Sequence, residues 1–503
     1  MTMNPNSFVA AAIAVGLAAT GLGLGGVALF PERVEARGPQ SVSPIAKVLI
    51  PAVVNISTSQ LSKGPKGIPL PDVPDGAPFE KFFDDFFDQE GDGPGVGRKV
   101  SSLGSGFVID GKEGLIVTNN HVITDADEIY ANFSDGSKLK VEKVIGRDPK
   151  TDLALLKVTP NMPLAEARFG SSEVMEVGDW VMAIGNPFGL GGSVTVGIIS
   201  AKERDINSGP YDDYLQTDAA INKGNSGGPL FNMDGDVIGV NTAIISPTGG
   251  SIGIGFAVPS DTAINVIAQL REFGEARRGW LGVRIQSISE DIAGTLGVAE
   301  SKGALVASVE PDSPAAKGGI ESGDVILKFG GKEVATMRGL PRLVAGAPIG
   351  KKVPVEILRK GKPLTVEVEV GLLKETPAND NEDDAGGDGN DKNKDKDKDK
   401  ESGSPGGIGG LTVSALSDAL RAKYEIDEKA EGVVVTEVEA GSIADKKGLK
   451  KGDLIVEVSH VKVASVEAMT EAVGKARKSG RNRVLLRVES GKGAMRFVDV
   501  PLD

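Results

Sequence analysis

Two short segments of this chain occur twice at the same spacing, and this repeat constrains the fold more than any other feature. Residues 303–309 correspond to 432–438, and residues 323–326 correspond to 452–455, with the same offset in both pairs. An unbroken register of this kind identifies a duplicated small domain. Each copy reads as strand, helix, strand and second helix, so the sequence predicts two related α+β domains.

The part of the chain before the repeat has a different pattern. Between residues 103 and 259, short apolar runs alternate with turn residues, and no long helix interrupts them. Strands of this length and spacing indicate antiparallel sheets closed into barrels. The composition agrees, because 68 glycines and only 4% aromatic residues suit short strands and tight turns. One helix is predicted at residues 262–272, where this domain would end.

Charge and composition exclude several classes of function. The formal net charge is −14, which argues against a nucleic-acid partner, since phosphate binding needs a basic surface. The chain has no cysteine, which excludes disulfides, a thiolate nucleophile and cysteine-based metal sites. Its two histidines lie far apart in the sequence, so a histidine-based metal site is not expected either. We predict neither a cofactor nor a metal.

The sequence GNSGGP at residues 224–229 is the strongest functional signal. A serine hydroxyl such as that of Ser226 needs an imidazole to accept its proton and a carboxylate to orient the imidazole. His121 and Asp152 precede it in the order used by chymotrypsin-like proteases. The alternative order, serine first, belongs to α/β-hydrolases and would need His460, which lies in the second repeat. The first order is therefore the one we predict.

These residues belong to longer motifs that resemble the HtrA (Deg, or protease Do) family of serine proteases. The resemblance extends over nearly the whole chain from about Ser41. The motifs that carry it are TNNHV at residues 118–122, DPKTDLAL at 148–155, GNPFG at 185–189 and TDAAINKGNSGGP at 217–229.

The resemblance implies a mainly β protein with a trypsin-like double β-barrel followed by two α+β PDZ domains. The protease domain would occupy residues 41–275, and the PDZ domains residues 279–372 and 408–503. Two PDZ domains point to the protease Do branch of the family. The implied activity is that of an ATP-independent serine endopeptidase of the bacterial cell envelope, regulated by its PDZ domains and with chaperone activity.

Each residue of the predicted triad has a distinct role. His121 is the general base and then the general acid, Asp152 orients it, and Ser226 is the nucleophile. The backbone N–H groups of Gly224 and Ser226 would form the oxyanion hole, and glycine at position 224 lets its N–H turn inward.

The substrate pocket is expected to be apolar. In relatives that cut after basic residues, an aspartate stands six positions before the nucleophile, where this chain has Ala220. Ile221, Ile245 and Ile254 flank the same region, which favours aliphatic residues before the scissile bond. Because such residues are buried in folded proteins, the substrates would be unfolded or misfolded proteins. The alternative function is a chaperone or peptide-binding scaffold with incidental proteolysis, but an inactivated scaffold would typically show a broken triad.

The first PDZ domain contains a predicted carboxylate-binding loop, whose backbone N–H groups would hold a substrate C-terminus. The loop consists of Gly279, Trp280, Leu281, Gly282 and Val283. Residues 409–413 are its predicted counterpart in the second domain.

Three further segments complete the organisation. Residues 1–36 read as an export signal or an uncleaved anchor, so the rest of the chain would lie in the periplasm, either free or tethered to the inner membrane. Residues 61–99 form a long loop with an aromatic stripe, which could cover the barrel or dock on another subunit. Residues 376–407 are a charged linker predicted to be disordered, which would leave the last domain tethered rather than fixed. The aromatic stripe of residues 61–99 consists of Phe82, Phe83, Phe86 and Phe87.

The family resemblance also implies a homotrimer or multiples of it.

Overall fold

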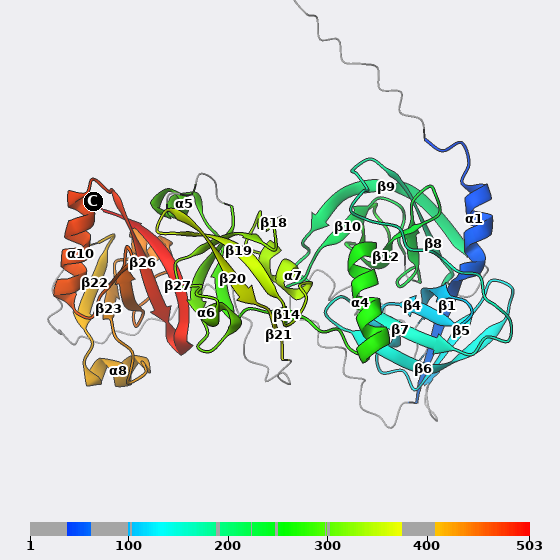
Figure 1. Ribbon diagram of the computed structural model, residues 1–503, viewed down its shortest axis with the longest axis horizontal. Helices are drawn as coiled ribbons and strands as arrows, with labels where there is room; N and C mark the ends of the chain where they lie inside the picture. Colours follow the sequence, from blue (N-terminus) through cyan, green and yellow to red (C-terminus); the bar gives the residue numbers. More distant parts are fainter. Residues whose placement is uncertain are drawn as a thin grey trace, which may run out of the picture. The chain divides into compact units, whose positions relative to one another are not determined.

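The computed structural model describes most of the chain after the predicted leader (Figure 1). The described residues are 38–61, 99–100, 103–187, 192–222, 224–246, 250–296, 298, 302–374 and 408–502. The predicted leader, the phenylalanine stripe and the charged linker lie outside them. Strands dominate the described residues, as predicted. None of the helices described is long and apolar enough to cross a membrane.

The first barrel closes because its first and fifth strands pair, and the short β2 (Lys99–Val100) pairs with the last two residues of β1 (Val53–Leu61). Successive side chains of a strand point to opposite faces of the sheet. Ile116 therefore points into the core of the first barrel, whereas Leu115 and Val117 join a second apolar cluster outside it. In barrel order, the strands are β1 (Val53–Leu61), β3 (Leu103–Asp110), β4 (Leu115–Thr118), β7 (Leu153–Val158), β6 (Lys138–Asp148) and β5 (Glu128–Asn132).

The second barrel is also closed and six-stranded. Its strands in order are β10 (Tyr214–Thr217), β13 (Gly255–Pro259), β12 (Val237–Ile244), β11 (Pro229–Phe231), β8 (Trp180–Gly185) and β9 (Ser193–Arg204). The apolar cluster that borders the first barrel continues into this one through Met182 and Phe231, so one core joins the two barrels.

Two helices pack on this shared core. The helix predicted at residues 262–272 is α4 (Ser260–Phe273), which buries Ala263, Ile267 and Leu270 there and ends at Gly274 with φ of +78°. Near the start of the described chain, α1 (Ser43–Leu49) buries Ala46 and Leu49 in the same core.

The two repeats fold into sheets with the same strand order, which confirms the predicted duplication. The first sheet contains β15 (Val283–Gln286), β16 (Ala304–Val309), β17 (Val325–Phe329), β19 (Lys352–Arg359) and β20 (Lys362–Glu369). The second contains β22 (Leu411–Ala415), β23 (Val433–Val438), β24 (Leu454–Val458), β26 (Arg483–Ser490) and β27 (Ala494–Pro501). The main helices are α5 (Glu290–Leu296), α6 (Pro314–Lys317) and α7 (Gly339–Ala345) in the first repeat, and α8 (Asp418–Tyr424), α9 (Ile443–Lys446) and α10 (Val466–Lys478) in the second.

Residues of the two repeats also contact one another. Leu485 and Phe497 share an apolar cluster with Leu305 and other side chains of the first repeat. The amide of Gln286 donates to the carbonyl oxygen of Phe497 at 3.0 Å and accepts from its N–H at 2.7 Å. The linker composition predicts a second domain that is only tethered, whereas these contacts hold it through side chains that lie outside the linker.

Candidate active site

The residues of the predicted triad come from both barrels. His121 lies on the short helix α3 (Asn120–Ile123), directly after β4. Asp152 lies in the turn between β6 and β7 of the same barrel, and Ser226 lies in the turn between β10 and β11 of the second barrel. The site is therefore carried by a short helix and two turns that closed sheets hold in place.

The carboxylate of Asp152 contacts His121 twice. Its Oδ1 accepts the backbone N–H of His121 at 2.9 Å, and its Oδ2 lies 2.6 Å from Nδ1 of the ring. Both side chains are largely buried, with 19% of His121 and 22% of Asp152 exposed. A carboxylate at Nδ1 favours the tautomer with its proton there, which leaves Nε2 to accept a proton from a nucleophile.

Asp152 has a backbone conformation that is unusual for a residue with a side chain. Its φ is +55°, in the left-handed region. The surrounding structure holds it there, because its carbonyl oxygen accepts from Nδ2 of Asn119 at 2.7 Å and from the N–H of Asn120 at 3.1 Å. The hydroxyl of Thr242 adds a bond of 2.5 Å to Oδ2. Sequence reasoning missed Thr242, which comes from β12 of the other barrel and carries no local motif.

Two glycines near Ser226 have a positive φ, a conformation that other residues rarely adopt. Gly224 has φ of +99° and Gly227 has φ of +84°. A Cβ at Gly227 would collide with the carbonyl oxygen of Ser105 and the hydroxyl of Thr118, so the first barrel approaches the turn closely here. Ser226 is buried, with 7% exposed.

The four predicted pocket residues have different environments. Ile245 and Ile254 are partly buried neighbours, with the N–H of Ile245 donating to the carbonyl oxygen of Ile254 at 3.2 Å. Ala220 is also partly buried, and its carbonyl oxygen accepts from Thr195 at 3.0 Å. Ile221 is 1% exposed and belongs to the core of the second barrel.

Helix α7 of the first repeat contacts the loop that joins β9 to β10 in the second barrel. Arg342 pairs with Asp213 at 2.8 Å and donates to the carbonyl oxygen of Asp212 at 3.2 Å, and Arg338 pairs with Asp205. Burial raises the pKa of the Asp212 carboxyl, although Ser208 partly offsets this by donating hydrogen bonds. Sequence reasoning missed these contacts, because arginines on a short helix give no pairing signal.

A second link between the domains lies beside Asp152. Arg278, which directly precedes the predicted carboxylate-binding loop, pairs with Asp148 at 2.5 Å, and both side chains are buried. Asp148 ends β6, four positions before Asp152, and Thr151 donates its hydroxyl to the same carboxylate at 2.5 Å. The guanidinium of Arg278 also lies 4.7 Å from the ring centroid of Tyr211.

Backbone hydrogen bonds connect the predicted carboxylate-binding loop to α6 and to the segment just before it. The carbonyl oxygen of Leu281 accepts from the N–H of Ala315 at 2.9 Å, and that of Gly282 accepts from the N–H of Glu310 at 2.9 Å. Gly282 has φ of +74°, and a Cβ there would collide with Ser313.

The second repeat has the same arrangement, but not in the register predicted from the sequence. Gly409 accepts from Ala444 at 3.0 Å and Gly410 accepts from Glu439 at 2.9 Å, so Gly410 is the equivalent of Gly282. The counterpart of residues 279–283 is therefore 407–411 rather than 409–413, and residue 407 lies outside the described part of the chain.

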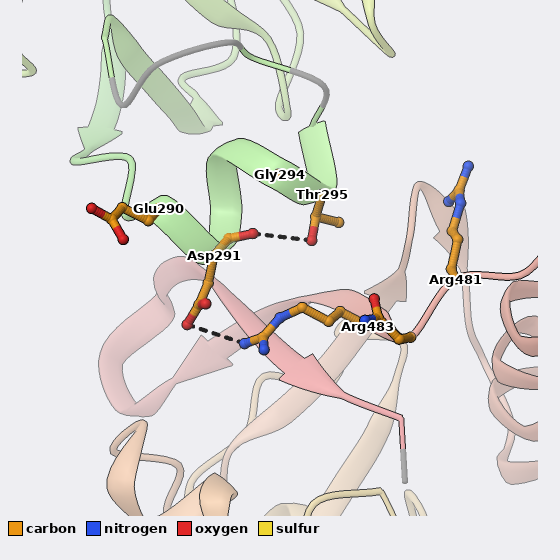
Figure 2. A pocket seen from close by; sticks show the side chains of 7 residues that line it. Glu290, Asp291, Gly294, Thr295, Arg481 and Arg483 are labelled. Carbon is orange, nitrogen blue, oxygen red and sulfur yellow. Dashed lines mark hydrogen bonds and ion pairs between the residues drawn. The ribbon is translucent and has the colours of Figure 1, made fainter.

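A pocket of about 370 Å³ lies where the two repeats meet (Figure 2). None of the residues that line it belongs to the predicted triad. Of its charged lining residues, Asp291 pairs with Arg483 at 3.1 Å, and it also pairs with Lys447, which lies outside the lining, at 2.7 Å. Arg481 points away from Asp291 in this view. In the described part of the chain, no group of three His, Asp or Glu side chains could hold a metal ion.

Family models match each of the three folded parts. Residues 104–240 match a trypsin-like peptidase domain, and residues 279–370 and 399–489 each match a PDZ domain. A probable periplasmic serine endoprotease, DegP-like, from Brucella melitensis biotype 1 is 42% identical over 94% of this chain and 92% of its own length. A protein of the same description from Rhizobium meliloti is 39% identical over 98% of each chain.

Solved structures give the same result. The HtrA-type protease AlgW with a decapeptide is 39% identical, with a TM-score of 0.53 over 67% of this chain and 100% of its own. The same protease with a tripeptide is 38% identical, also with a TM-score of 0.53, over 67% of this chain and 98% of its own.

Proposed function

This chain belongs to the HtrA family of serine proteases and is a DegP-like serine endopeptidase, and we propose that it degrades unfolded or misfolded proteins in the bacterial periplasm without ATP. His121 removes the proton from Ser226, whose oxygen attacks the scissile carbonyl carbon. The N–H groups of Gly224 and Ser226 bind the oxyanion. His121 then donates the proton to the leaving amine, and a water molecule hydrolyses the acyl-enzyme.

The contact between Asp152 and His121 carries this proposal. A carboxylate that accepts both the backbone N–H and the ring Nδ1 fixes the position of the ring as well as its tautomer. As the imidazole becomes a cation during attack, the same carboxylate stabilises it. Neither task is needed in a scaffold that only holds peptides.

The proposed substrates follow from the residues that are predicted to form the substrate pocket. Ala220, Ile245 and Ile254 offer no charge to a basic side chain, so the enzyme would cut after aliphatic residues, which become accessible when a protein unfolds. Digestion of β-casein in a buffer without ATP, with the cleavage sites mapped by mass spectrometry, tests this proposal. We expect cuts after Val, Ile, Leu and Ala, and none by the Ser226→Ala variant, which lacks the nucleophilic oxygen. Cutting by Ser226→Ala, or cuts mainly after Lys and Arg, would refute it.

The first PDZ domain would regulate this activity by binding an apolar C-terminus at residues 279–283. A peptide can add as a strand beside β15, which is the outermost strand of its sheet. The buried pair of Arg278 and Asp148 then connects the loop to the turn that carries Asp152. A tenfold activation needs a differential affinity of only about 1.4 kcal/mol between the active and resting states.

Two peptides test this regulation. A peptide with a free aliphatic C-terminus should increase casein cleavage, and the same peptide as a C-terminal amide should not. The response should survive truncation at Thr376, which removes the second PDZ domain. Equal stimulation by the amide, or loss of the response on truncation, would contradict a route through this loop.

Assembly and chaperone activity complete the proposal. We propose a homotrimer or multiples of it, supported by apolar side chains that the barrels leave in water: Val174 is 74% exposed, Val177 63% and Trp180 41%. Suppression of substrate aggregation by Ser226→Ala would separate holding from cutting. Export through the N-terminal segment would place the protein where its relatives are named to act.

A further inference from the structure

Ser105 contacts both the turn that carries the predicted nucleophile and the loop that follows β8. It belongs to β3 of the first barrel and is 0% exposed. Its hydroxyl donates to the carbonyl oxygen of Gly224 at 2.5 Å and accepts from the N–H of Asn186 at 2.9 Å. One side chain of the first barrel thus bridges two backbone groups of the second.

The backbone of Ser105 contacts the same turn. Its N–H donates to the carbonyl oxygen of Ser226 at 2.8 Å. The N–H of Ser226 belongs to the peptide group between residues 225 and 226. Ser105 therefore holds the carbonyl oxygens of the peptide groups immediately before and after it.

This turn needs an external support. Gly224 and Gly227 both have positive φ, and glycine gives the backbone more conformations than any other residue. An oxyanion hole is effective only when its N–H groups already point at the developing charge before the reaction begins. Without the hydroxyl of Ser105, the peptide group after Gly224 loses the hydrogen bond that the first barrel gives it.

We propose that Ser105 is a positioning residue for proteolysis, whose hydroxyl bridges Asn186 and Gly224 and thereby orients the N–H of Ser226 in the oxyanion hole. The inference rests on the proposed proteolytic function. It assigns no contact between Ser105 and the substrate. Its effect is on the transition state, in which the oxyanion has formed, and not on the binding of the peptide.

The Ser105→Ala variant of the full-length protein tests the proposal, with a chromogenic peptide that has an aliphatic residue before the scissile bond. Loss of one oxyanion donor lowers kcat by roughly 10²- to 10³-fold. We expect a smaller loss here, about 10- to 100-fold, because the donors remain but are less well oriented. KM should change by less than about twofold, since ground-state binding is not involved.

A peptide boronate gives a readout that a purely structural role would not change. Its tetrahedral adduct with Ser226 places an oxygen in the oxyanion hole, so its Ki should weaken in Ser105→Ala by the same factor as kcat falls. Ser260→Ala is the matched control, because Ser260 is also 0% exposed and donates its hydroxyl to a glycine carbonyl, that of Gly170, at 2.7 Å. It should lower Tm while leaving kcat and Ki unchanged.

Ser105→Cys keeps the measurement possible if Ser105→Ala does not fold. A thiol is a weaker donor than a hydroxyl, so its kcat should lie between those of wild type and Ser105→Ala. Wild-type kcat in a folded Ser105→Ala or Ser105→Cys variant would overturn the proposal, as would a fall in kcat with an unchanged boronate Ki. A wild-type protein without peptidase activity would instead refute the proposed function.

Discussion

Thr242 donates its hydroxyl to Oδ2 of Asp152 at 2.5 Å, the same oxygen that lies 2.6 Å from Nδ1 of His121. The bond crosses from the second barrel to the first. It therefore fixes the carboxylate relative to the turn that carries Ser226, and it adds to the bonds that hold Asp152 from within its own barrel.

Thr242→Val should lower kcat and leave KM nearly unchanged. A hydrogen bond to a charged group contributes about 1.5–3 kcal/mol, which corresponds to roughly a tenfold to hundredfold loss. Thr295→Val is the matched control, since Thr295 also donates to a carboxylate, Asp499, at 2.6 Å but lies in the first PDZ domain. Steady-state kinetics should separate the two, and equal kcat values would show that Thr242 does not position the carboxylate.

Arg278→Ala should destabilise the protein by about 3–5 kcal/mol, because it leaves the buried carboxylate of Asp148 without its positively charged partner. Arg271→Ala serves as the comparison. Its pair with Glu113 is exposed, and pairs of that kind contribute about 1 kcal/mol or less. Denaturant unfolding measures both variants, and similar losses would mean that Asp148 finds another partner.

The environment of His460 predicts that the protein loses stability in mild acid. Burial lowers the pKa of its imidazole, with Lys360 and Arg481 acting in the same direction, while Glu457 and Asp324 partly oppose them. In the unfolded chain the pKa is about 6.5, so the unfolded state binds the proton first as the pH falls. The contribution of His460 to the free energy of unfolding is therefore complete above about pH 6.5 and decreases as the pH falls through the pKa of the folded state.

Calorimetry at pH 7.5 and 5.5 checks this prediction. The drop in Tm between the two values should be smaller in His460→Gln than in wild type. His460 also lies against the first PDZ domain, with Cε1 3.3 Å from the position of a Cβ on Gly323. An equal drop in wild type and His460→Gln would contradict the assignment.

Assembly should depend on the apolar segment at residues 174–180. Val177→Asp with Trp180→Asp should give smaller particles in analytical ultracentrifugation than wild type does. Ile264→Asp, on the exposed face of α4 with 40% of Ile264 exposed, is the control and should change nothing. The same measurement on Phe83→Asp with Phe87→Asp tests the phenylalanine stripe, and an unchanged distribution would remove that stripe from the interface.

The features that the sequence predicts correctly are those that depend on residues close together in the chain. The duplicated segments predict two similar sheets and the short apolar runs predict closed barrels, and the structure contains both. The order of His121, Asp152 and Ser226 indicated a pair that the structure brings within 2.6 Å, His121 with Asp152. Ser226→Ala tests the role of the nucleophile, and the roles of His121 and Asp152 stay predictions.

Contacts between distant segments could not be predicted in this way. Ser105 and Thr242 reach the site from strands of different barrels, and nothing near them in sequence marks their partners. The φ of Asp152 is decided by bonds from Asn119 and Asn120, whereas aspartate alone would favour an ordinary conformation. The sequence places the loop of the second PDZ domain two positions too far along the chain, because consecutive glycines match in more than one register.

The side-chain amide of Gln286 would help to keep the two PDZ domains together if the chain were cut between them. It satisfies both backbone groups of Phe497, as a neighbouring strand would, and so joins the two PDZ domains without a peptide bond. A molecule nicked between residues 375 and 407 would then elute as one particle. The two pieces, made separately, would form a split protein whose halves recognise each other.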